Sequence, residues 1–243
     1  MKDYLLDIVK HTYSLGFISL VKVTGTDETT TIEGLAEDRS VILQATTKKP
    51  VADFMGTFGM PNLDKLGVIL RIPEYAENAN ISINTQERNG EQVPVGIAFS
   101  NSSGDFKNDY RFMASEIINE KLKTVKMRAV NWGIDFEPTV ASIQRFKFMI
   151  SANSEETTFI AKTEGGDLKF YFGDHSTHAG SFDFAKGIAG ALKHAWSWPV
   201  AQVQAILGLD GKLTMKISDQ GAMQITVDSG LAEYNYILPA QSK

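Results

Sequence analysis

The chain has 243 residues, of which 43% are hydrophobic, with no cysteine and a formal net charge of −5 at pH 7. This length suits one large or two ordinary globular domains. The absence of cysteine excludes disulfides, thiolate zinc sites and a cysteine nucleophile, and the acidic balance argues against a surface that coats nucleic acid all over. Apolar runs fall short of the roughly 18 residues of a membrane helix, and Asp3 and Asp7 stand where a signal peptide is apolar. We therefore expect a cytoplasmic protein.

The chain begins with a predicted helix that leads into strands. Leu5, Ile8 and Val9 share one side of this helix, which Gly16 closes. Segments rich in β-branched residues and separated by turn residues predict strands at 17–23, 29–35 and 40–45. A helix is expected next at 50–60, because proline suits the first turn and glycine the end. Further strands are expected at 66–72, 81–85, 93–99 and 109–114.

Residues 115–138 interrupt this pattern. Charged residues, among them Glu116, Lys121, Lys126 and Arg128, crowd a stretch without strand alternation. We predict a first domain at 1–115, an interdomain connector at 116–138 and a second domain at 139–243.

The second half repeats the order of the first. A helix at 139–153, with Phe146 and Met149 on its inner side, precedes strands at 157–163, 168–172 and 181–185. A second helix follows at 199–209, and strands at 213–217, 223–227 and 234–238 finish the chain.

One short segment occurs twice in corresponding places. The segment Pro-Val-Ala-Asp-Phe-Met-Gly-Thr-Phe-Gly-Met begins at Pro50, and Pro-Val-Ala-Gln-Val-Gln-Ala-Ile-Leu-Gly-Leu begins at Pro199, 149 positions later. Each copy predicts a short helix with one apolar stripe. The sequence therefore indicates a duplicated unit with the order helix, strands, helix, strands.

This duplicated pattern resembles the sliding DNA clamps, the processivity factors of replicative polymerases. It is most similar to the two-domain clamps of tailed phages and of the proliferating cell nuclear antigen type. The residues that carry the resemblance are the two Pro-Val-Ala segments, the basic connector ending in Phe136-Glu137-Pro138, and a final strand that stops at Leu238-Pro239-Ala240.

The resemblance implies both a fold and a function. The fold is an α+β DNA-clamp fold of two similar domains, each built from two helix-plus-strands units, with outer β-sheets and inner helices. The function is that of a non-catalytic ring, a homotrimer without cofactor, that encircles double-stranded DNA regardless of sequence. Such a ring tethers a DNA polymerase after an ATP-dependent clamp loader has opened it. A viral clamp of this kind works in the host cell cytoplasm.

Five basic residues are the candidates for facing DNA: Lys10, Lys48, Lys49, Arg145 and Lys147. A sliding ring needs positive charge directed at phosphates rather than groups that read bases. An ordinary solvated face remains the open alternative for these side chains. Phe148 lies on the same polar side as Arg145 and Lys147, where it contacts either DNA sugars or a neighbouring loop.

The connector and the tail are the candidates for a partner pocket. In the family that the sequence resembles, partners insert apolar anchors beneath the connector and beside the C-terminal segment. The matching positions are Met127, Val130, Ile237, Leu238 and Pro239. Buried strand ends are the alternative interpretation of the tail residues.

Motifs for catalysis are missing. The sequence contains no phosphate-binding loop, nucleophile elbow or dinucleotide fingerprint. The segment 174–178, Asp-His-Ser-Thr-His, could ligate a metal, but its position between strands and its Ser and Thr favour a polar turn. Two other functions remain open: a structural virion or tail protein with duplicated β-rich domains, and a carbohydrate-active β protein.

Overall fold

The structure is a computed structural model that describes residues 1–88, 90–124, 129–174 and 178–241. The chain forms two compact units, which we treat separately. Unit 1 comprises Met1–Val125 and Ser229–Tyr234, and unit 2 comprises Lys126–Asp228 and Asn235–Lys243. Among the described residues, none of the helices combines the length and apolar character that crossing a lipid bilayer requires.

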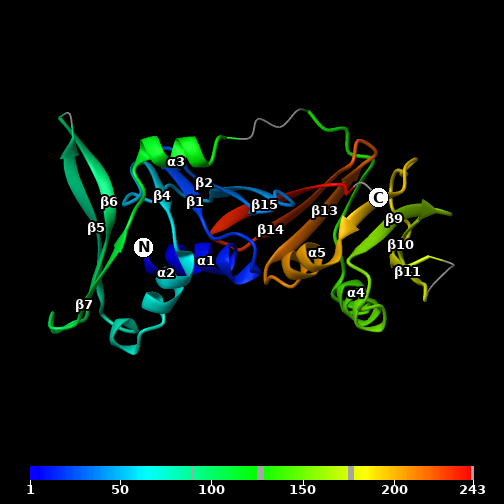
Figure 1. Cartoon of the computed structure of the whole chain (residues 1–243), viewed down its shortest axis with the longest axis horizontal. Coiled ribbons are helices and arrows are strands. Elements are labelled where there is room, and N and C mark those ends of the chain that lie inside the picture. Colours follow the sequence, from blue (N-terminus) through cyan, green and yellow to red (C-terminus); the bar gives the residue numbers. More distant parts are fainter. Residues whose placement is uncertain (89, 125–128, 175–177, 242–243) are drawn as a thin grey trace. The chain divides into compact units, whose positions relative to one another are not determined.

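Unit 1 contains α-helices and antiparallel strands (Figure 1). Its helices are α1 (Lys2–Lys10), α2 (Leu63–Leu70) and α3 (Ser115–Lys121). The first sheet contains β1 (Val21–Gly25), β2 (Thr30–Leu35), β3 (Ile42–Thr47) and β4 (Gly56–Met60), in the order β4-β1-β2-β3. The second sheet contains β5 (Asn80–Arg88), β6 (Glu91–Ser100) and β7 (Lys107–Arg111), with β6 in the middle.

The core of unit 1 follows from strand alternation and helix amphipathicity. Every second residue of β2 is buried, as expected of a strand with one face on a core. The helices α1 and α2 lie side by side (Figure 1). A Cβ atom at Gly67 would lie 3.2 Å from Cγ1 of Val9, so glycine permits this close approach of the two helices.

The structure contradicts two of the predicted elements in unit 1. Residues 50–60 form a turn and then strand β4, which pairs with β1, instead of a helix. The second helix of this half is α2, in a region where we expected a strand at 66–72. The repeated Pro-Val-Ala segment therefore does not mark the same element in both halves.

The described part of unit 2 contains two α-helices and antiparallel strands. The helices are α4 (Val140–Ala152) and α5 (Val200–Leu207). One sheet has the order β11-β10-β9-β12, from β9 (Thr158–Glu164), β10 (Asp167–Phe172), β11 (Gly180–Ala185) and β12 (Trp196–Pro199). The other has the order β15-β14-β13-β8, from β8 (Ile134–Phe136), β13 (Lys212–Ser218), β14 (Ala222–Asp228) and β15 (Ala232–Pro239), whose first residues belong to unit 1.

An aromatic cluster fills the core of unit 2 beneath α4. The fully buried ring of Phe146 lies 5.1 Å from the ring of Phe159 and 5.6 Å from that of Phe170, measured between centroids. The helix α5 confirms the prediction from the second Pro-Val-Ala segment, since Pro199 caps it and Val200, Val203 and Ile206 are buried. In each half the order of elements is helix, strands, helix, strands, as predicted.

The predicted connector contains two short elements, α3 and β8. Its residues 125–128 lie outside the described part of the chain. The boundaries that we placed at 115–116 and 138–139 remain predictions.

Candidate DNA interface and partner cavities

The helix α4 combines positive charge with a complete absence of acidic residues. Arg145 and Lys147 are its two charged side chains. Its N-terminus is capped without a carboxylate, because Thr139 Oγ1 accepts a hydrogen bond from the Ser142 N–H at 3.0 Å, and Ser142 Oγ accepts one from the Thr139 N–H at 3.0 Å. Nothing on α4 therefore offsets its two cations.

Neutral groups orient Arg145. Its Nη1 donates a hydrogen bond to the carbonyl oxygen of Asp183 at 3.2 Å, and the guanidinium carbon lies 5.3 Å from the ring centroid of Phe182. Because a carbonyl and a ring are neutral, these contacts hold the guanidinium in place without cancelling its charge. Lys147 is half-buried, and Arg145 is exposed.

The helices of unit 1 carry mixed charge. Lys10 is exposed at the end of α1, which also contains Asp3 and Asp7. Two basic residues of this region were not predicted as helical: Lys65 lies on α2, and Arg71, which was predicted in a strand, is the C-cap residue of α2.

Lys48 and Lys49 lie on the loop between β3 and β4. Both side chains are exposed. The backbone of this loop is fixed, since the Lys48 N–H donates to the Leu231 carbonyl at 2.8 Å and Thr47 Oγ1 donates to the Lys49 carbonyl at 2.7 Å. We expected these lysines just before a helix, and the structure shows them in a loop that leads to strand β4.

The five predicted pocket residues differ in accessibility. Met127 lies outside the described residues, Val130 is half-buried and Pro239 is exposed. Ile237 and Leu238 are 5% and 0% exposed, so their side chains are buried, which agrees with the alternative of buried strand ends. Among the described members of this set, Val130 and Pro239 retain surface that a partner can reach.

A buried lysine holds the beginning of the predicted connector. Lys22, on β1, is 4% exposed, and its Nζ lies 2.7 Å from Oε2 of Glu33 on β2. The same Nζ donates hydrogen bonds to Thr124 Oγ1 at 2.6 Å and to the Leu122 carbonyl at 3.3 Å. Lys22, Glu33 and Thr124 line a cavity of about 490 Å³ that also includes Gln44 and Asn119. A single lysine in a strand usually points to solvent, so the sequence offered no signal for this site.

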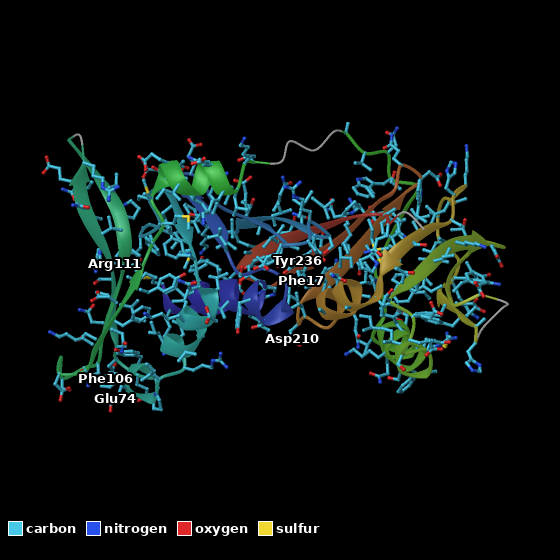
Figure 2. All side chains as sticks on the ribbon, viewed as in Figure 1. Phe17, Glu74, Phe106, Arg111, Asp210 and Tyr236 are labelled. Carbon is cyan, nitrogen blue, oxygen red and sulfur yellow. The ribbon has the colours of Figure 1, made fainter. Side chains whose placement is uncertain are left out.

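A second cavity of about 330 Å³ lies among β4, β5, β6, β7 and the start of α3. Arg88 and Arg111 line it together with Gln86, Thr57 and Glu116. Figure 2 shows Arg111 on β7. The Arg88 guanidinium donates to Gln86 Oε1 at 3.3 Å, and Val93, Pro94 and Phe112 add apolar surface to the lining.

A polar network joins α1 to β15 and to Ser229, which precedes this strand. Asp7 Oδ2 accepts hydrogen bonds from Ser229 Oγ at 2.9 Å and from Tyr234 Oη at 2.8 Å, and Oδ1 lies 3.2 Å from His11 Nδ1. The buried ring of His11 stacks on Tyr234 with centroids 4.2 Å apart. Burial raises the pKa of Asp7, but these hydrogen bonds and the nearby His11 outweigh it and lower the pKa below 3.8.

The interpretation of segment 174–178 as a polar turn or a metal site stays a prediction. Residues 175–177 lie outside the described part of the chain. Among the residues that the structure does describe, no three His, Asp or Glu side chains gather as metal ligands would.

The sequence and the structure were compared with known proteins, and the matches are to solved structures of one fold. No family model matches the sequence, and no curated protein matches it. Solved structures match the whole chain. One, described as the C-terminal region of FEN-1 bound to A. fulgidus PCNA, has a TM-score of 0.70 at 10% identity, covering 100% of this chain and 96% of that chain. A PCNA from Thermococcus kodakaraensis has a TM-score of 0.69 at 9% identity, and the match covers 98% of this chain and 97% of that chain.

The chain has the PCNA-type DNA-clamp fold. The α+β clamp fold predicted from the sequence is therefore confirmed over the whole length. Three basic residues were not singled out from the sequence: the buried Lys22, Lys65 on α2 and Arg71 at the end of α2.

Proposed function

We propose that this protein is a sliding clamp, a ring of three copies that encircles duplex DNA and tethers a DNA polymerase. The observation that carries the proposal is the match to PCNA structures over the entire chain, with a TM-score of 0.70. A clamp of this kind performs no chemical step. It increases processivity because an enclosed duplex cannot diffuse away from the ring.

Attraction to DNA would come from phosphate contacts that do not depend on sequence. Arg145 and Lys147 on α4 are the strongest candidates, because α4 contains no carboxylate that opposes them. Lys10, Lys48 and Lys49 are exposed and contribute as further DNA-facing residues. Their attraction is expected to weaken as salt rises, while enclosure does not depend on salt.

Ring closure would pair the open edges of sheets on neighbouring copies. Strand β11 lies at one edge of its sheet, and β5 and β7 lie at the two edges of theirs. Unpaired edges tend to associate with other chains, and pairing between copies satisfies their backbone groups. An ATP-dependent loader must then open the ring, because a closed ring cannot thread onto circular DNA.

The partner site would lie along the connector and the tail. One similar structure holds the C-terminal region of FEN-1 on a PCNA. By analogy, we infer that a segment of the polymerase binds here, with Val130 and Pro239 as accessible anchors and Met127, Ile237 and Leu238 as neighbouring positions of the site. We further propose that the clamp is viral, related to those of tailed phages, and acts in the host cytoplasm.

Retention on nicked circular DNA tests this function. The loaded clamp should remain on the circle through gel filtration and leave once a restriction enzyme linearises the DNA. Sedimentation should give three times the chain mass of 26.8 kDa. A stable monomer at micromolar concentration, or release from circles and linear DNA at the same rate, would refute the proposal and favour a structural virion protein.

A further inference from the structure

We propose that Phe148 on α4 contacts the sugars of the enclosed duplex and adds a component of DNA grip that salt does not weaken. The inference rests on the proposed clamp function. Phe148 is 63% exposed, whereas Phe146 of the same helix is fully buried.

The exposure of Phe148 follows from the helix geometry. Phe146 fixes the inward face of α4 through its contacts with Phe159 and Phe170. Two residues further along, a side chain lies about 200° around the helix axis, which directs Phe148 away from the core. The alternative that this ring packs on a loop of its own unit does not agree with its exposure.

The surroundings of Phe148 indicate what would cover it. Residues one turn away on α4 share its face, and those are Gln144, Arg145, Ser151 and Ala152, all exposed. These neighbours are the polar side chains of Gln144 and Ser151, the methyl group of Ala152 and the cation of Arg145, and α4 contains no carboxylate. A deoxyribose between two phosphates has the complementary pattern, an apolar centre between anionic groups.

This arrangement separates two kinds of attraction on one helix. The contacts of Arg145 and Lys147 with phosphates release counterions and so weaken as salt rises. Contact between a phenyl ring and a sugar removes apolar surface from water, and that gain does not depend on counterions. Phe148 would thus keep α4 close to the duplex at salt concentrations that screen the two cations.

One-dimensional diffusion on DNA with blocked ends provides the test. Labelled clamp is loaded, and its diffusion coefficient is measured at about 50, 150 and 300 mM salt, a range over which phosphate attraction changes strongly. Phe148→Ala should diffuse roughly threefold to fivefold faster at every salt concentration, because one apolar contact is lost. Removing Arg145 and Lys147 together, each as alanine, should accelerate diffusion most at low salt.

Two variants serve as controls. Phe148→Tyr keeps the ring and should diffuse like the wild type. Ile117→Ala removes an apolar side chain that is 49% exposed on α3, and it should have no effect on diffusion.

The outcomes distinguish the inference from the proposed function. A wild-type clamp that is retained on circles while Phe148→Ala diffuses normally, or accelerates only at low salt, would overturn the inference alone. Loss of the trimer in Phe148→Ala would place the phenyl ring of Phe148 at the subunit joint and would likewise overturn the inferred DNA contact. A wild-type protein that is not retained would refute the clamp function, and the DNA contact with it.

Discussion

The buried ion pair of Lys22 and Glu33 should stabilise the fold and hold the beginning of the connector, and the loss on breaking it can be worked out from the structure. Replacing Lys22 with methionine keeps the length of the side chain but removes the charge that Glu33 and Thr124 contact. Losing one partner of a fully buried ion pair costs about 3–5 kcal/mol. Because the Glu33 side chain stays 21% exposed and water can solvate it, we expect a loss of about 2–3 kcal/mol in the free energy of unfolding.

Urea unfolding and limited trypsin digestion provide the assays for Lys22→Met. The variant should unfold at lower urea concentration, and the exposed Lys123 should be cleaved faster, since Lys22 no longer holds Leu122 and Thr124. The double variant Lys22→Met with Glu33→Leu should regain most of the stability, because an apolar pair replaces the ion pair. Its connector should remain susceptible to trypsin.

A lysine with an exposed ion pair provides the matched control. Lys216 lies on strand β13, 3.4 Å from Asp135, and both side chains are partly exposed. Lys216→Met should cost less than about 1 kcal/mol. Equal losses for Lys22→Met and Lys216→Met, with no recovery in the double variant, would refute the idea that the buried pair holds the connector.

Three further predictions concern charge, acid stability and backbone packing. Replacing Arg145 and Lys147 with glutamate should weaken clamp loading and processive synthesis while sedimentation still shows the trimer; no change in either activity would remove these residues from the DNA interface. Asp7→Asn should reduce the free energy of unfolding by about 1–3 kcal/mol at pH 7. Folding lowers the pKa of Asp7 below 3.8, so the stabilisation that its carboxylate provides is complete above pH 3.8 and is lost as the pH falls through the lowered pKa. The melting curves of the wild type and of Asp7→Asn should therefore converge at acid pH, below 3.8. Gly25→Ala would place a Cβ 1.4 Å from the Phe54 carbonyl oxygen, and thermal melting should show a loss of more than about 3 kcal/mol.

The sequence predicted the order of elements in both halves, and it misassigned one repeated segment. In the second copy, Gln202, Gln204 and Ala205 favour helix and no glycine interrupts it. In the first copy, Gly56 has a positive φ of 80°, and Gly56 and Gly59 flank Thr57 and Phe58 in a strand. Pairing with β1 outweighed the proline at the start, which shows how tertiary contacts override a short local pattern.

The missed helix α2 illustrates an ambiguity that sequence alone does not resolve. The segment from Leu66 to Ile72 is apolar, with β-branched residues that suit a buried strand as well as a buried helix. As a helix, the segment packs against α1 with Gly67 close to Val9, a residue far away in the sequence.

The candidate site was only partly predictable for a similar reason. The two cations of α4 could be predicted from helical periodicity, because Arg145 and Lys147 flank the buried Phe146, each about 100° away from it around the helix axis. The contacts of Lys22 could not be predicted from the sequence. Its Nζ bonds to Leu122 and Thr124, which lie about 100 positions later in the chain. Burial of Ile237 and Leu238 likewise depends on the packing of β15 rather than on its alternation.

The most direct test of the central claim is the lifetime of the loaded protein on nicked circular DNA before and after linearisation. Our account predicts a complex that survives on the circle at high salt and dissociates when a single cut opens it. A lifetime that the cut leaves unchanged would contradict encirclement and, with it, the proposed function.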